Sequence, residues 1–227
     1  MSTLVLRLEG PLQSWGTSLS KQAHRDTALM PTKSGVIGLI ANAMGRDRSE
    51  SVADLAAGRF AVRTERPGVV LSDYHTGRST ELIAHQRRVK GPKAKVGAEK
   101  TLLSTRLYLH DAAFIAFLEL EDDLAAKVVK SLRHPARQLF LGRRGCPPTG
   151  PVLVGIVLES MEEALQVWGG GVKGRWSMDS SFDDPSAQID DDVPISFDSG
   201  HRKHSRRAVL TGGHVEPVIQ HHDPFDF

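Results

Sequence analysis

The sequence has a single cysteine, almost no net charge and no long apolar run. Cys146 has no second cysteine to pair with, which excludes an internal disulfide and a metal site built from several cysteines. The longest apolar run, residues 152–158, is too short to span a bilayer. The N-terminal stretch carries Arg7 and Glu9 in a short apolar segment and does not have the pattern of a signal peptide. We therefore expect a cytoplasmic protein that does not enter a membrane.

Length and composition are those of an ordinary globular protein. The 227 residues are 40% hydrophobic, which is enough for a substantial core in one large domain or two small ones. The net charge of +2 says little about partners, so the distribution of the charges along the chain matters more. We expect a main domain at residues 1–160 and a C-terminal extension at residues 161–227.

The first predicted helix covers residues 35–44. Its apolar side chains recur at helical spacing, Ser34 is the expected N-cap, and Gly45 is expected to end the helix. Apolar and β-branched runs elsewhere predict strands. These strands are expected at residues 3–8, 60–65, 69–75, 114–120 and 152–159.

A second helix is predicted at residues 123–133, with Asp122 or Asp123 as its cap and Pro135 as its stop. The elements thus follow the order strand, helix, several strands, helix, strand. This order is typical of the split βαβ, ferredoxin-like unit that RNA-recognition folds use, an α+β class. The aromatic signature of an ordinary RNA-recognition motif is absent, so base stacking on the sheet face is not expected.

Residues 77–106 interrupt this scheme with a polar, basic segment. Between residues 85 and 106 it holds seven lysines and arginines, too many to find internal partners in so short a span. We expect an excursion such as an extended hairpin, and either phosphate binding or a solvated flexible loop would use this charge. The basic residues considered for phosphate binding are Arg87, Arg88, Lys90, Lys93, Lys95 and Arg106.

Residues 179–198 form the opposite kind of segment. They are rich in aspartate and contain no lysine or arginine. We expect a solvated acidic loop within the C-terminal extension.

The stretch PTKSG, residues 31–35, resembles a nucleotide-binding loop at first sight. A Walker loop needs glycine directly before its lysine and again five positions earlier, where this sequence has Thr32 and Thr27. The nucleotide-hydrolase interpretation therefore fails. The N-terminus of a helix still favours an anion, and Thr32, Lys33 and Ser34 would add a charge and two hydroxyls. The alternative, which spacing favours, is a plain capped helix with an exposed lysine.

The motif LGRRGCPP, residues 141–148, places Arg143 and Arg144 in a loop that two prolines close. The two guanidinium groups are candidates for a bidentate phosphate clamp. An ordinary surface loop is the alternative. Cys146 has no histidine near it in sequence, so we expect a packed small residue and not a nucleophile.

Tyr74 and His75 follow Asp73 at the end of a predicted strand. Together with a lysine they are candidates for metal-independent RNA cleavage by general acid–base chemistry, although a structural or RNA-contacting role is favoured. Trp15, in the loop after the first strand, is a candidate for stacking on a base or for a place in the core. The histidines near the C-terminus match no metal motif, and no metal or cofactor is expected.

Several stretches together resemble a known family. They are LVLRLEGPLQSWG (4–16), PTKSGVIGLIANAMG (31–45), SDYHT (72–76), TLLSTRLYLHDAAF (101–114) and LGRRGCPPTGPVLVG (141–155). The chain resembles the CasD group of the Cas-five family, subunits of the type I-E CRISPR Cascade surveillance complex. The likeness is specific over residues 4–155 and weak beyond residue 160.

This resemblance implies a modified, RAMP-type RNA-recognition fold with a protruding β-hairpin thumb, which would fall at about residues 77–106, and a small C-terminal β extension. It implies a non-catalytic subunit that binds and caps the 5′ handle of the CRISPR RNA. Its partners would be the CasC-type backbone subunits, the CasA-type large subunit and target DNA in the assembled complex. The residues then expected to bind RNA are Trp15, Thr32, Lys33, Ser34, Tyr74, His75, Arg87, Arg88, Lys90, Lys93, Lys95, Arg106, Arg143 and Arg144.

Two other functions remain open at this point. Subunits of the same broad family in type I-C systems process precursor RNA with a tyrosine, a lysine and a histidine, so an endoribonuclease that cuts repeat RNA is the first. It would use Tyr74 and His75 with Lys33 or a thumb lysine. The second is a general binder of single-stranded RNA with no preference for the handle.

Overall fold

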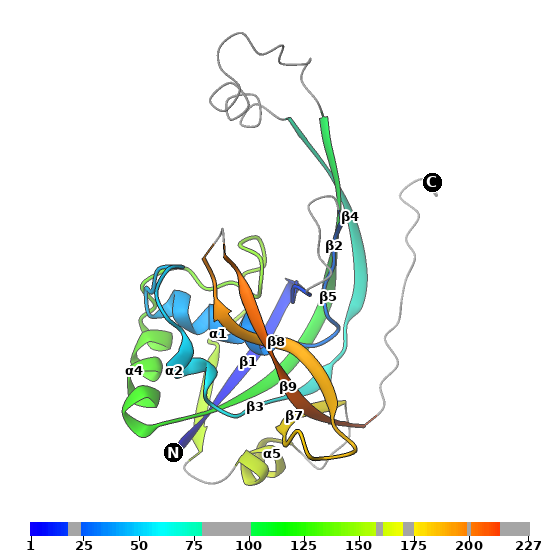
Figure 1. The fold of residues 1–227 in the computed structure, drawn as a ribbon. Helices are drawn as coiled ribbons and strands as arrows, with labels where there is room; N and C mark the ends of the chain where they lie inside the picture. The colour runs from blue at the N-terminus through cyan, green and yellow to red at the C-terminus, as the bar shows by residue number, and fades with distance from the viewer. Residues whose placement is uncertain (18–23, 79–100, 158–160, 170–174, 199–200, 214–227) are drawn as a thin grey trace.

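The computed structural model describes residues 1–17, 24–78, 101–157, 161–169, 175–198 and 201–213. They form one large, mainly antiparallel sheet with helices on both of its faces (Figure 1). The main path of the sheet has the order β6-β1-β5-β3-β7-β9-β8, and β2 and β4 pair with β5. The strands are β1 (Ser2–Gln13), β2 (His24–Arg25), β3 (Phe60–Arg66), β4 (Val69–Arg78), β5 (Thr101–Leu120), β6 (Leu153–Val157), β7 (Trp176–Ser180), β8 (Gln188–Ser196) and β9 (Lys203–Gly212).

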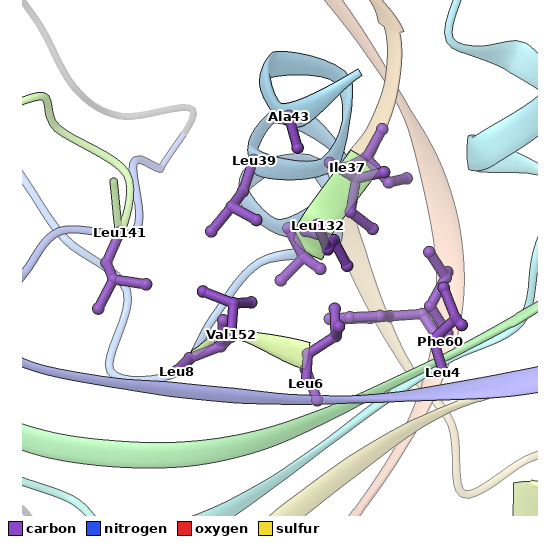
Figure 2. Packing of buried hydrophobic residues seen from close by; sticks show 14 of the residues in the cluster. Leu4, Leu6, Leu8, Ile37, Leu39, Ala43, Phe60, Leu132, Leu141 and Val152 are labelled. Carbon is purple, nitrogen blue, oxygen red and sulfur yellow. The ribbon is translucent and has the colours of Figure 1, made fainter. Parts of the chain in front are cut away.

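The helices are α1 (Lys33–Ala43), α2 (Ala53–Ala56), α4 (Asp122–Arg133) and α5 (Met161–Gly169). The main core lies between the sheet and the face that α1 and α4 cover. Alternation along β1 turns Leu4, Leu6 and Leu8 toward these helices, where they meet apolar side chains of α1 and α4 such as Ile37 and Leu132 (Figure 2). A smaller cluster on the opposite face packs Val5 and other apolar strand residues against α5.

Strand β5 connects the two parts of the sheet. Its residues 113–118 lie between β1 and β3, whereas its residues 101–110 pair with β4. The β4–β5 ladder extends away from the helices and from the rest of the sheet (Figure 1). At residues 105 and 106 the parallel strand β2 lies along the other side of β5. Residues 77–78 and 101–106 of the predicted excursion belong to this ladder, and residues 79–100 lie outside the described residues, so the excursion as a whole stays a prediction.

The predicted helices are confirmed, but both predicted caps are wrong. Helix α1 begins at Lys33, and its N-cap is Thr32, whose hydroxyl accepts a hydrogen bond from the Gly35 N–H at 3.2 Å. Helix α4 begins at Asp122, and its N-cap, Glu121, makes no capping bond through its side chain. The Asp122 carboxylate instead accepts a hydrogen bond from the hydroxyl of Ser2, a residue distant in sequence, at 2.7 Å.

The acidic segment 179–198 is not a solvated loop. Much of it lies in β7 and β8, which join the main sheet through β9 and through the pairing of β7 with β3. Asp179 and Asp192 point inward and form ion pairs with the cations of α1 and β9. These ion pairs replace the hydration that an exposed carboxylate would have. The strands after residue 160 thus continue the sheet of the main body, and the division into domains at this position stays a prediction.

Candidate nucleic-acid interface

The loop at residues 141–148 is attached to the sheet at closely spaced points. Leu141 and Cys146 are fully buried, and the Leu141 N–H donates to the Cys146 carbonyl at 2.7 Å. The Ser14 N–H donates to the Leu141 carbonyl at 3.1 Å. Gly142 has a φ of +87°, and a Cβ on it would lie 1.7 Å from the Ser14 carbonyl oxygen. Only glycine fits at this position, so the loop can lie this close to the end of β1.

Cys146 serves packing in this loop. Its side chain is fully buried in the main core. Burial raises the pKa of the Cys146 thiol, which keeps it protonated and unreactive. The prediction of a packed cysteine is confirmed.

The guanidinium group of Arg143 makes hydrogen bonds and a ring contact within the protein. Its Nη1 donates to the Leu107 carbonyl of β5 at 3.1 Å, and its Nη2 donates to the Arg25 carbonyl of β2 at 3.0 Å. The guanidinium carbon lies 4.5 Å from the centre of the Tyr108 ring, a cation–π contact. Arg143 is thus directed back onto the two strands, and the bidentate phosphate clamp predicted for Arg143 and Arg144 stays a prediction.

Arg144 and Arg106 differ from Arg143 in what they contact. Arg144 is exposed and has no partner among the described residues. Arg106, on β5, is half-buried, and its Nε is a buried donor that meets no acceptor in the described part of the chain. Arg144 therefore keeps donors available for an external anion, whereas the Arg106 Nε is enclosed by the protein.

Tyr74 and His75 lie on opposite faces of β4. Tyr74 is 60% exposed, and its partner in the ladder is Thr105. The next residue, His75, points to the other face, where its Nε2 lies 2.5 Å from the Asp73 Oδ2. Successive strand residues cannot both approach one phosphodiester from the same side, so β4 does not assemble the tyrosine–histidine pair that the ribonuclease alternative requires.

The N-terminus of α1 already holds an anion from the protein. The Lys33 N–H donates to the Asp192 Oδ2 at 2.7 Å, and the Lys33 Nζ lies 2.9 Å from the Asp179 Oδ2. Lys33 and Ser34 are both buried. The alternative interpretation of PTKSG, a plain capped helix, expected an exposed lysine and is wrong on this point. The dipole argument was right about the preference for an anion, but the anion is a carboxylate of β8.

Arg207 completes what we call the buried ionic network, made of Lys33, Asp179, Asp192 and Arg207. Its Nε and Nη2 donate to the two oxygens of Asp192 at 2.5 and 3.1 Å, a bidentate pair, and its Nη1 donates to the Asp179 Oδ1 at 2.5 Å. The Asp179 Oδ2 also accepts the Phe60 N–H at 3.0 Å. Two cations and two carboxylates balance, so the network leaves no charge for RNA.

Trp15 belongs to the core. Its side chain is fully buried, and its Nε1 donates to the Gln13 Oε1 at 3.1 Å. A Cβ on Gly35 would lie 2.7 Å from the indole ring, which shows how closely the ring packs on the first turn of α1. The core alternative is confirmed, and base stacking by Trp15 is wrong because neither face of the ring reaches solvent.

The remaining predicted residues fall into two groups. Thr32 is the cap of α1 and lies beside the buried network. Five basic residues predicted to bind RNA lie outside the described residues, and their role stays a prediction. They are Arg87, Arg88, Lys90, Lys93 and Lys95.

Sequence reasoning missed Arg25. This exposed arginine lies on β2, a strand of two residues, and is brought beside Arg106 by the pairing of β2 with β5. Two residues are too few to show a period of two, so no local pattern pointed to it.

Among the described residues, no group of three or more histidine, cysteine, aspartate or glutamate side chains is arranged to hold a metal ion. No helix among them is long and apolar enough to cross a membrane.

Comparison with known proteins gives consistent matches over most of the chain. The family described as CRISPR-associated protein (Cas_Cas5) matches residues 3–210. The CRISPR system Cascade subunit CasD of Escherichia coli (strain K12) is 33% identical over 168 residues, which are 68% of this chain and 70% of that protein.

Two solved structures share the fold. A chain of a CRISPR RNA-guided surveillance complex is 27% identical and superposes with a TM-score of 0.71, covering 92% of this chain and 89% of its own length. A structure described as a crystal structure of Cas protein is 33% identical with a TM-score of 0.68, covering 92% of this chain and 93% of its own length.

Proposed function

This chain belongs to the Cas5 family of CRISPR-associated proteins, and we propose that it is the non-catalytic RNA-binding subunit of a type I-E CRISPR Cascade antiviral surveillance complex. In this role it binds and caps the 5′ handle of the CRISPR RNA and helps to assemble the complex on it. The support is twofold, since the similar curated protein is a Cascade subunit and a similar solved chain comes from an RNA-guided surveillance complex.

The topology supports the ferredoxin-like part of the proposal. The order β6-β1-β5-β3, with antiparallel neighbours throughout, is the order expected when two βαβ units are split and interleaved. Helix α1 follows β1 and α4 follows β5, as such a unit requires. The β4–β5 ladder, which extends away from this unit (Figure 1), supports the assignment of residues 77–106 and their flanks to a thumb.

The observation that carries the RNA-binding role is the presentation of Arg144. The loop at 141–148 is fixed by Gly142 and Cys146, and Arg144 projects from it without a carboxylate partner among the described residues. The fixed loop sets the position of the Arg144 backbone, and its planar guanidinium can donate two parallel hydrogen bonds to a phosphate. The partners that we infer are the CRISPR RNA handle, CasC-type and CasA-type subunits and target DNA, in the cytoplasm and without a cofactor.

Binding to repeat RNA tests this proposal. A labelled RNA with the repeat-derived 5′ handle should bind the full chain more tightly than a scrambled RNA of equal length. Affinity for both should fall as salt rises, since phosphate contacts release counterions. Co-expression with the CasC-type and CasA-type subunits should place the chain in a complex with CRISPR RNA. Equal affinity for both RNAs together with exclusion from that complex would favour a general single-stranded RNA binder.

The alternative function is a metal-independent endoribonuclease that processes repeat RNA. The half-exposed Asp73–His75 pair favours it, because a carboxylate orients a histidine for proton transfer. Two contacts weigh against the predicted set of residues, since Tyr74 lies on the other face of β4 and Lys33 is paired with Asp179. End-labelled repeat RNA incubated with the chain in a chelator should stay intact on a denaturing gel. A discrete product that His75→Ala abolishes would establish the enzyme and overturn the non-catalytic role.

A further inference from the structure

Two arginines face each other across the junction of β2 and β5. The parallel register pairs Arg25 with Arg106, which places both side chains on one face of two neighbouring strands, about 4.8 Å apart along the hydrogen-bonding direction. On the far side of β5, the residue paired with Arg106 is Asp73. The Asp73 carboxylate, however, lies against the His75 imidazole at 2.5 Å. The arginine pair is therefore not neutralised by the one carboxylate in its row.

Like charges directly opposite each other in a ladder destabilise it, so this arrangement needs a reason. Neither Arg25 nor Arg106 bonds to a carboxylate in the described part of the chain, and the Arg106 Nε is a buried donor without an acceptor. Arg207 shows how this protein treats an arginine that serves the fold, because all of its nitrogens meet aspartates. A row of arginines left without carboxylates is suited to an anion from outside the chain.

Arg143 attaches β2 to this row. Strand β2 pairs with β5 over only two residues, and the Arg143 Nη2 adds a hydrogen bond to the carbonyl of Arg25 itself at 3.0 Å. Its Nη1 holds the Leu107 carbonyl on β5 at 3.1 Å, while its plane lies over Tyr108. One guanidinium thus ties the 141–148 loop to both strands. A lysine has a single ammonium on a flexible stem and cannot reproduce two divergent hydrogen bonds and a stacked plane.

We propose that Arg25 and Arg144 bind phosphates of single-stranded RNA, and that Arg143 is a positioning residue that holds Arg25 and the loop carrying Arg144 at this junction of β2 and β5. The four residues Arg25, Arg106, Arg143 and Arg144 form what we call the arginine surface. The inference rests on the proposed RNA-binding function and identifies where on the chain the RNA backbone lies. Its contacts are to phosphates, so they carry no sequence preference.

The experiment compares charge removal with charge retention at three positions of the full chain. Arg25, Arg143 and Arg144 are each changed to alanine and to lysine, with Arg133→Ala on the exposed end of α4 as the matched control. Fluorescence anisotropy with a labelled handle RNA and with oligouridylate of equal length gives affinity at several salt concentrations. Hydrogen exchange of amides 24–28 reports whether β2 stays in place.

Arg25→Ala and Arg144→Ala should each weaken binding of both RNAs by about two- to five-fold and lower the salt slope by about 0.7, while their lysine variants keep the slope. Arg143→Lys should lose affinity as Arg143→Ala does, although it keeps the charge, and both should speed exchange at amides 24–28. In an Arg25→Ala background the Arg143 variants should cost less than they do alone, because part of their effect acts through Arg25.

Opposite results overturn the inference in distinct ways. If Arg143→Lys binds like the unmodified chain while Arg143→Ala does not, Arg143 is itself a phosphate contact. If Arg25→Ala and Arg144→Ala behave like Arg133→Ala, the RNA lies elsewhere. Should both Arg143 variants fail to fold, the Arg25 and Arg144 slopes still decide. A chain that binds oligouridylate as well as handle RNA, with the expected slopes, would refute the proposed handle function and leave this surface established.

Discussion

The buried ionic network and the arginine surface both contain arginine, but among the described residues the guanidinium groups meet carboxylates in the first and none in the second. In the network, Arg207 is 7% exposed and bonds to Asp192 and Asp179, whose side chains are 12% and 14% exposed. On the arginine surface, Arg143 bonds only to carbonyl oxygens, and Arg25 and Arg144 are exposed with no carboxylate partner among the described residues. The network includes Lys33 of the PTKSG motif, and the arginine surface includes Arg143 and Arg144 of the LGRRGCPP motif.

The difference shows that partners, and not residue type, decide whether a cation serves the fold or a ligand. Charges removed from water are stabilising only when counter-charges and hydrogen bonds replace the lost hydration. The network meets this condition with two carboxylates for two cations. The arginine surface does not meet it and stays in contact with solvent, where a phosphate can supply the missing negative charge.

The largest expected effect comes from removing the central cation of the network. Arg207→Leu leaves Asp179 and Asp192 buried with Lys33 as their remaining cation, so the free energy of unfolding should fall by about 3–5 kcal/mol. Urea denaturation followed by circular dichroism measures the loss. The neighbour Arg206 is exposed and pairs with Asp191 at 3.2 Å, so Arg206→Leu should cost about 1 kcal/mol or less. Equal losses for the two variants would mean that burial does not separate these arginines.

A backbone substitution tests whether the arginine surface depends on the fixed loop. Gly142→Ala forces alanine into a φ of +87° and against the Ser14 carbonyl, so it should lower the free energy of unfolding by about 2–4 kcal/mol. RNA affinity should fall as well, because Arg143 and Arg144 move with the loop. The matched control is Gly145→Ala, since a Cβ there meets nothing within 4 Å. Normal RNA binding by a folded Gly142→Ala variant would show that the loop position does not matter.

Lys33 distinguishes the two regions directly, because its motif was expected to bind RNA. Lys33→Met removes one cation from Asp179, which keeps Arg207 and the Phe60 N–H, so stability should fall by about 1.5–3 kcal/mol. Affinity of the folded variant for handle RNA should not change, because the Lys33 ammonium is buried in the network. Anisotropy at a temperature well below the unfolding transition measures this. A loss of affinity and of salt slope would place Lys33 in the RNA site after all.

The smallest effect concerns Asp190, at the solvent edge of the network. Burial raises the pKa of its carboxyl above the ordinary value, against the attraction of Arg207 at 3.6 Å. A raised pKa in the folded state means that stability declines as pH rises from about 3.9, the unfolded pKa, through the folded pKa. Because solvent screens the half-exposed Asp190 side chain, Asp190→Asn should gain only about 0.5 kcal/mol or less at pH 7, and nothing at pH 3. Urea titrations at both pH values check the sign, with Asp191→Asn as the exposed control.

Elements with a strong local pattern were predictable from the residues. The alternation of LVLRL, the helical spacing of residues 35–44 and the stop at Pro135 correspond to β1, α1 and the end of α4. The family likeness likewise rests on ordered motifs and holds over most of the chain. Cys146 was correctly expected to pack in the core. For β1, α1 and the end of α4 the deciding pattern lies within a few residues, so the sequence displays it, whereas the expectation for Cys146 followed from its residue type and from the lack of a nearby histidine.

The partners of charged side chains were not predictable in this way. Lys33 and Asp179 are 146 positions apart, and Asp192 reaches the α1 N-terminus from 159 positions away. Arg25 and Arg106 become neighbours only through the register of a two-residue strand. Local composition therefore predicted an exposed lysine and a solvated acidic loop, and it gave no reason to select Arg25. Burial and charge pairing are properties of the packed chain, because the free energy of a charge depends on which groups surround it after folding.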